Sequence, residues 1–223
     1  MQVLAAGAMA HADGNAAYID QAGDGNTATQ TQVGLDNSAY VDQVGDANSA
    51  TQVQNGTSNQ ATIGQSGDSN TGLQAQSGLS NNAAIGQSGS AATASQLQSG
   101  NLNAAYVTQV GWQAASDQVQ IGNGNTADAV QNGTLDLLQQ TQMGDGNTAF
   151  GAQTGDSSTL QQTQLGSDNQ SKASQLGSND FMSLEQIGDN NAVSGSQIGS
   201  GLSYSITQTG GGAPITIVQT APH

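Results

Sequence analysis

Polar and apolar residues alternate along this chain in runs of seven, and each run is followed by four residues that include glycine. The first run, 15–21, places Asn15, Ala17, Ile19 and Gln21 on one face of an extended strand, because successive side chains of a strand point to opposite faces. A helix is disfavoured, since the period of two persists and glycine recurs in every unit. The pattern therefore predicts short strands joined by tight turns.

The unit is repeated every eleven residues without an insertion. Gln ends each run from Gln21 to Gln219, and a glycine stands two residues later from Gly23 to Gly210. Such glycines supply the positive φ that a turn needs. The first eight turn glycines are Gly23, Gly34, Gly45, Gly56, Gly67, Gly78, Gly89 and Gly100. Strict spacing argues against disorder and for units that bury their inner faces by stacking on one another.

The fifth position of the run shows that the true period is two units. Odd-numbered units carry Ile19, Val41 or Ile63 there, whereas even-numbered units carry Gln30, Gln52 or Gln74. One rung is therefore two strands and 22 residues long. We predict an all-β fold: a two-strand-per-rung β-solenoid of stacked β-arches, with two facing parallel sheets and about nine and a half rungs.

The two strands of a rung should run antiparallel, so that the fifth residue of an odd strand faces the third residue of the next even strand. Early rungs then pair a large with a small residue, as in Ile63 with Gly72. Late rungs reverse the sizes, as in Gly151 with Leu160 and Gly195 with Tyr204. Because cores tolerate exchanges that conserve total volume, this reversal supports contact between the paired residues.

Identical amides at both ends of each strand are expected to form stacking ladders, in which donors and acceptors about 4.8 Å apart satisfy one another. In odd strands the ladders comprise Asn15, Asn37, Asn59, Asn81, Asn103, Asn125, Asn147, Asn169 and Asn191, with Gln21, Gln43, Gln65, Gln87, Gln109, Gln131, Gln153, Gln175 and Gln197. In even strands they comprise Gln32, Gln54, Gln76, Gln98, Gln120, Gln142, Gln164, Gln186 and Gln208, whereas the first position changes from Asn through Ala to Asp136, Ser158, Asp180 and Leu202.

The repeats span 15–219, with an N-terminal segment, 1–14, and a C-terminal tail, 220–223. Residues 1–12 end in an Ala-x-Ala pattern typical of a signal cleavage site but lack a positive start. They are either a signal remnant or a degenerate strand, since residues 4–10 continue the even-strand pattern backwards. The ends of the solenoid should be assembly edges, with Asn15 and Ile19 at one end and Ile215, Ile217 and Gln219 at the other.

Composition narrows the function. The net charge is −15 and Lys172 is the only basic residue apart from two histidines, so we expect no nucleic acid as partner. No apolar run is long enough to span a membrane. His11 and His223 lie outside the regular units, and no catalytic constellation or cofactor motif is evident, so we expect neither enzymatic activity nor a cofactor.

Two outward features have alternative interpretations. Asp24, Asp46 and Asp68 should stack on one edge, either as solvated turn residues or as gatekeepers whose repulsion slows premature assembly. Calcium at the Asp-Gly-Asn turns is a weaker alternative, because calcium-binding β-rolls have a nine-residue period. One outward column contains the aromatic residues Tyr18, Tyr40, Tyr106 and Phe150. They are either ordinary surface residues of the strands, or a lateral contact between fibres or a ridge on which matrix ligands stack.

The unit Asn-x-Ala-x-x-x-Gln-x-Gly-x-x-Asn, found from Asn15 to Gln219, resembles the curlin repeat of the curli family, bacterial extracellular functional amyloids. The resemblance implies a secreted subunit that polymerises with itself into cross-β fibres of the biofilm matrix, serving adhesion and surface colonisation. It also implies a nucleator subunit and an outer-membrane secretion channel with accessory chaperones as partners. This chain departs from the best-known members in having more repeats and no recognisable secretion-targeting segment.

Three roles remain open from the sequence. The major-subunit role, with head-to-tail polymerisation, fits better than the nucleator role, because a nucleator at an anionic cell surface is expected to carry basic residues. A monomeric secreted β-solenoid acting as an adhesin or binding module is the alternative from another class.

Overall fold

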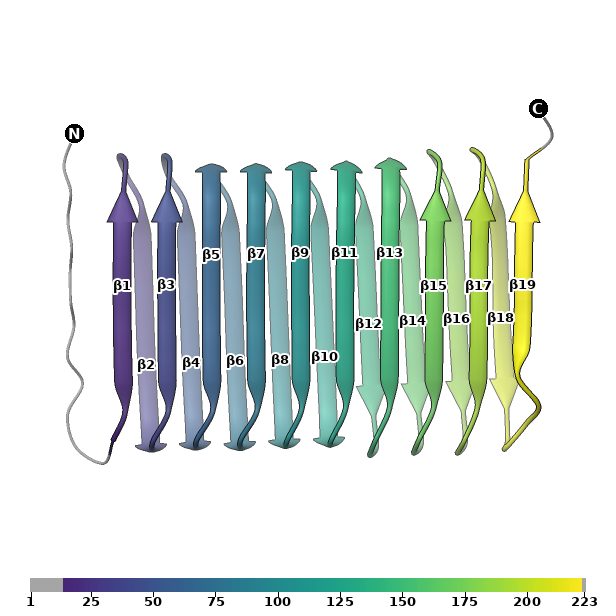
Figure 1. The fold of residues 1–223 in the computed structure, drawn as a ribbon, viewed down its shortest axis with the longest axis horizontal. Helices are drawn as coiled ribbons and strands as arrows, with labels where there is room; N and C mark the ends of the chain where they lie inside the picture. Colours follow the sequence, from purple (N-terminus) through teal and green to yellow (C-terminus); the bar gives the residue numbers. More distant parts are fainter. Residues whose placement is uncertain (1–13, 222–223) are drawn as a thin grey trace.

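The computed structural model describes residues 14–221 as two parallel β-sheets that face each other along the whole length of a solenoid (Figure 1). No helix long and apolar enough to cross a membrane occurs in this part of the chain. The odd-numbered strands are β1 (Ala16–Ala22), β3 (Ser38–Val44), β5 (Gln60–Asp68), β7 (Asn82–Ser90), β9 (Ala104–Trp112), β11 (Thr126–Thr134), β13 (Thr148–Asp156), β15 (Gln170–Leu176), β17 (Ala192–Ile198) and β19 (Ile215–Thr220). The even-numbered strands are β2 (Thr27–Leu35), β4 (Ser49–Thr57), β6 (Thr71–Leu79), β8 (Thr93–Asn101), β10 (Ala115–Asn123), β12 (Leu137–Met143), β14 (Thr159–Leu165), β16 (Phe181–Ile187) and β18 (Ser203–Thr209).

Odd strands form one sheet in chain order from β1 to β19, and even strands form the other from β2 to β18. Paired residues lie 22 positions apart along the chain, as Ile19 does from Val41 and Gln30 from Gln52. The two-strand rung predicted from the fifth position is therefore confirmed. Within residues 14–221 the odd sheet has ten strands and the even sheet nine.

The space between the sheets holds a narrow apolar core flanked by amides. Ile63, Leu138, Leu160 and Met182 are among its largest fully buried side chains. In two of the predicted pairs that contain a glycine, the partner side chain packs against that glycine. A Cβ added at Gly72 would lie 3.1 Å from Ile63 Cγ2, and one added at Gly151 would lie 2.9 Å from Leu160 Cδ2.

The last full rung extends the same rule. Gly195 faces the Tyr204 ring, whose hydroxyl donates to Met182 Sδ at 3.2 Å. Burial of this hydroxyl raises the pKa of Tyr204 to about 12. The size reversal read from the sequence is thus a physical exchange of side-chain volume across the core.

The turns use two left-handed positions, of which the sequence indicated only one. The glycine two residues after the last Gln of a strand has positive φ in nearly every turn, as Gly67 does at +111°, and a Cβ at Gly67 would strike the Gly89 carbonyl of the next rung. The residue before the strand-initial polar position also has positive φ in many turns, including non-glycine residues such as Ala47 at +56° and Leu102 at +57°. Asn, Asp and Gly often occupy such a position and would have signalled it, but Leu102 gives no such signal.

The repeat region needs one correction at its boundary. Thr220, expected to begin the C-terminal tail, is the last residue of β19, because it continues the parallel pairing opposite Ile198. Residues 1–13, with His11 and the expected strand at 4–10, lie outside the described residues, as does His223.

Candidate functional site

Buried Gln ladders run along both inner faces. In the odd sheet Nε2 of each Gln donates to Oε1 of the Gln 22 residues later, unbroken from Gln21 to Gln219. Nε2 also donates to a backbone carbonyl of the facing strand at most rungs, as Gln43 does to Thr27 O at 3.2 Å. Such an amide therefore ties a rung both to its neighbour and to the opposite sheet.

The even sheet carries two such Gln ladders. One continues from Gln32 to Gln186 at the seventh position, and the other from Gln30 to Gln162 at the fifth. The fifth-position ladder ends at Gln162, which donates to Ser171 Oγ, and Leu184 and Ile206 replace Gln beyond it. At the last rung Gln208 Nε2 donates instead to Ala213 O, across the loop that enters β19.

The Asn ladders run in the opposite direction. Asn59 Nδ2 and its backbone N–H both donate to Oδ1 of Asn37, one rung earlier. The same Nδ2 donates to the carbonyl of Gly78, 19 residues later. The bonds to the preceding Asn recur at each odd strand up to Asn191, which donates to Asn169. The two kinds of ladder therefore run in opposite directions: Gln Nε2 donates to the next Gln, whereas Asn Nδ2 and N–H donate to the preceding Asn, and Nδ2 alone also donates forward to a turn carbonyl.

Acceptors without a partner lie in the first and last full rungs, because the Gln ladders donate forward, the Asn ladder donates backward, and the even-sheet Gln ladder stops at Gln186. Among residues 14–221, seven buried side-chain atoms have no hydrogen-bond partner. Gln30 Oε1 and Gln32 Oε1 lie on the first rung, and Asn191 Oδ1 and Gln208 Oε1 on the last. The remaining atoms are Ser116 Oγ, Asp136 Oδ2 and Asp180 Oδ2. An unpaired buried polar atom costs about 1–3 kcal/mol, so these atoms lower the stability of the first and last full rungs in a single chain.

The expected assembly edges lie at these ends. β1, with Asn15 just before it and Ile19 within it, is one edge of the odd sheet, and β19, with Ile215, Ile217 and Gln219, is the other. Ladder residues at mid-length are fully buried, whereas Gln21, Gln32 and Gln219 are half-buried. The inner faces of the end rungs are thus only partly covered.

Asp24, Asp46 and Asp68 stack along one turn edge as expected. The backbone N–H of Asp24 donates to Asp46 Oδ1 at 2.8 Å, and that of Asp46 donates to Asp68 Oδ1 at 3.1 Å. The carboxylates of Asp46 and Asp68 therefore hold successive turns together. Asn101 and Asn123 lie on the opposite edge, where the Asn101 N–H donates to Asn123 Oδ1 in the same way, so the position needs an acceptor oxygen and not a charge.

The outward aromatic column is only partly continuous. The rings of Tyr18 and Tyr40 stack with centroids 5.1 Å apart and planes at 4°. Asp128 separates Tyr106 from Phe150 in the same column, and burial there raises the pKa of its carboxyl.

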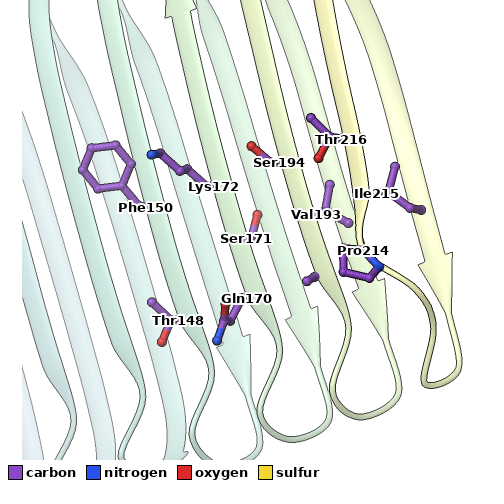
Figure 2. Close-up of a pocket in the computed structure, with 11 residues that line it drawn as sticks. Thr148, Phe150, Gln170, Ser171, Lys172, Val193, Ser194, Pro214, Ile215 and Thr216 are labelled. Atoms are coloured by element: carbon purple, nitrogen blue, oxygen red, sulfur yellow. The ribbon is translucent and has the colours of Figure 1, made fainter.

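A shallow groove of about 370 Å³ follows the column toward the C-terminal end. Phe150 and Lys172 lie side by side on β13 and β15 as its wall, and Pro214, Ile215 and Thr216 line it at the β19 end (Figure 2). Small residues between them, including Ser194, leave the hollow. The single Lys of the chain thus lies beside an apolar groove.

Metal-binding groups do not stand out in the described part of the chain: no cluster of three or more His, Cys, Asp or Glu side chains is placed to hold an ion.

Comparisons with protein-family models and with curated protein sequences gave no match.

Proposed function

We propose that the chain is a structural subunit that polymerises head to tail into extracellular, curli-like functional amyloid fibres of a biofilm matrix, where it serves adhesion and surface colonisation. The observation that carries this proposal is the pair of complementary end faces. Each end has an open strand edge in both sheets, and buried amide oxygens that lack a donor lie in the first and last full rungs.

Polarity supports addition in one orientation. The inner Gln ladders direct Nε2 toward the C-terminal end, so a second copy placed beyond β19 would offer Gln21 Oε1 to Gln219 Nε2. Two copies meeting by like ends would lack this match of donor to acceptor. An unpaired parallel strand edge adds a further strand by the bonds that already join successive rungs, and a head-to-tail contact that does not close yields a filament.

Secretion and partners follow from the curlin-like repeat. The proposal includes export to the cell surface through an outer-membrane channel and initiation on a separate nucleator, as the family resemblance implies. A monomeric adhesin is the competing function, and the groove beside Phe150 and Lys172 is the feature that favours it.

The test is to dilute the denatured full-length chain into buffer and to examine the product by negative-stain microscopy and fibre diffraction. Filaments with a meridional reflection at about 4.8 Å support polymerisation. Discrete particles that stay monomeric at high concentration contradict it and favour the binding module.

A further inference from the structure

Two carboxyl groups occupy ladder positions at which other rungs place an amide. Asp136 and Asp180 begin even strands, where Asn26, Asn48 and Asn70 stand in earlier rungs. Each is almost fully buried, with 1% and 2% of its surface exposed. Within residues 14–221 neither has a basic partner, since Lys172, the one Lys or Arg of the chain, points outward from β15.

The carboxyl groups lie in the same orientation as the amides. Asp136 Oδ1 accepts the Ser158 N–H at 3.0 Å, and Asp180 Oδ1 accepts the Leu202 N–H at 2.8 Å. Asn48 Oδ1 accepts the Asn70 N–H in the same way at 3.0 Å. Oδ2 of each Asp therefore takes the place of the Asn Nδ2.

In the Asn rungs this place is a hydrogen-bond donor. Asn48 Nδ2 donates to Gly67 O at 2.7 Å and Asn70 Nδ2 to Gly89 O at 3.0 Å, in each case 19 residues along the chain. Ser158, which lies between the two Asp in the column, also directs its hydroxyl at the equivalent carbonyl, Gly177 O, at 3.5 Å. The position thus faces an acceptor in each of these rungs.

The equivalent acceptors for the two Asp are Gly155 O and Gly199 O. A Cβ added at Gly133 would meet both Gly155 O and Asp136 Oδ2, and one added at Gly177 would meet both Gly199 O and Asp180 Oδ2. Both Oδ2 atoms are buried and have no partner. As carboxylates they would oppose a carbonyl oxygen with no proton between them, an arrangement that is costly in a desolvated site.

We propose that Asp136 is a proton-operated latch for rung stacking: as a neutral acid it donates its Oδ2 proton to Gly155 O and closes the turn, and as a carboxylate it loosens the rungs around β12 and β14. Asp180 repeats the geometry one full rung beyond Ser158. The proton comes from solvent and returns to it, and the latch operates in a single chain whether or not the chain polymerises.

The surroundings of Asp136 favour the neutral form. Burial raises the pKa of its carboxyl to about 6, the Ser158 N–H lowers it, and the negative charge of Asp156 raises it further. Asp156 ends β13 in the next rung, whereas the preceding rung presents Ala114 and Trp112, which carry no charge. Asp156 itself accepts the Thr134 N–H at 3.1 Å.

The sign of the pH effect follows from this shift. Between about pH 4 and pH 6 the folded chain keeps a proton at Asp136, whereas the unfolded chain has already released it. The latch is therefore fully closed below about pH 4, and its stabilisation is lost as the pH rises through about 6. This is opposite to an ion-paired carboxylate, which stabilises a fold at neutral pH.

A titration tests the latch directly. The full-length folded protein is labelled with ¹³C at Asp carboxyl carbons, and the Asp136 signal is identified by its loss in Asp136→Asn. We expect that signal to titrate near pH 6. A signal that has fully titrated below pH 5 would overturn the proposal.

Hydrogen exchange tests its consequence. In peptides covering 148–160, corrected for intrinsic exchange rates, we expect protection to fall by up to about a hundredfold between pH 4 and pH 7.5. Asp136→Asn supplies a permanent donor, so it should keep the acid-state protection at both pH values. Asp136→Ala, which introduces the residue type of Ala92 and Ala114 in the same column, should give low protection at both.

The matched control is Asp189→Asn, which changes an exposed turn carboxylate that accepts the Ser167 N–H. It should keep the pH dependence of the unmodified chain. Unchanged pH dependence in Asp136→Asn, or none in the unmodified chain, would overturn the latch.

Discussion

A side chain at a turn glycine has no room, because the turns of successive rungs are stacked backbone on backbone. A Cβ at Gly67 would strike the Gly89 carbonyl, and φ there is +111°. Gly64, three residues earlier in β5, has no atom within 4 Å of such a Cβ. Position 67 therefore requires glycine, whereas position 64 of the same strand has room for a side chain.

We predict that Gly67→Ala lowers the free energy of unfolding by about 1–3 kcal/mol through backbone strain, with the carbonyl clash adding to it. The matched Gly64→Ala should change it by less than about 0.5 kcal/mol. Denaturant unfolding followed by circular dichroism measures both. Equal unfolding midpoints for the two variants would contradict a steric requirement for glycine at position 67.

A separate prediction concerns the three stacked carboxylates on one turn edge. Replacing Asp24, Asp46 and Asp68 together by Asn keeps the acceptor oxygen that the neighbouring N–H groups use and removes three negative charges. If these residues act as gatekeepers, the lag before fibre formation shortens, and the effect weakens at high salt because screening already reduces the repulsion. An unchanged lag at low salt would leave them a purely structural role.

At the scale of strands and turns, the sequence predicts the fold well because its signals repeat. The two-strand rung, the parallel sheets and the contact between Ile63 and Gly72 all follow from positions read in register. The direction of the ladders does not, since an amide can donate either way and only the strand geometry decides. The burial of Asp136 beside a carbonyl was also unpredicted, although the sequence showed Asp at an Asn position.

Volume exchange across the core can be tested with one pair. Ile63→Ala should cost about 2–5 kcal/mol by leaving a cavity, and Gly72→Val about 1–3 kcal/mol by overpacking. Together they recreate the late-rung arrangement, so the double variant should cost less than the sum by about 0.5–3 kcal/mol. Gly72→Val combined with the distant Leu160→Ala is the control and should be additive. Additivity in both pairs would contradict direct packing of Ile63 on Gly72.

For the whole molecule, the unequal strand numbers decide how two copies fit. Placing β1 of a second copy on β19 continues the odd sheet, but β18 and the second copy's β2 are then separated by one missing even strand. If residues 1–14 are a degenerate strand and not a signal remnant, residues 4–10, with Leu4, Ala6, Ala8 and Ala10 on the inner face, supply that strand. These residues lie outside the described part of the chain.

The missing even strand predicts how the effects of two deletions on the rate of seeded elongation combine. Removing residues 1–12 leaves the even sheet one strand short at each junction, and ending the chain after Thr209 removes β19 and leaves the odd sheet short. Each deletion alone should slow elongation by about tenfold, the effect of about 1.4 kcal/mol at the docked end. Both together should restore the rate, because each sheet then has nine strands and the ends meet flush.

Seeds are made from the same variant as the monomer, so that every junction is uniform. A double deletion no faster than either single one would contradict the half-rung fit, and an unchanged rate after removing 1–12 would show that those residues do not complete the even sheet.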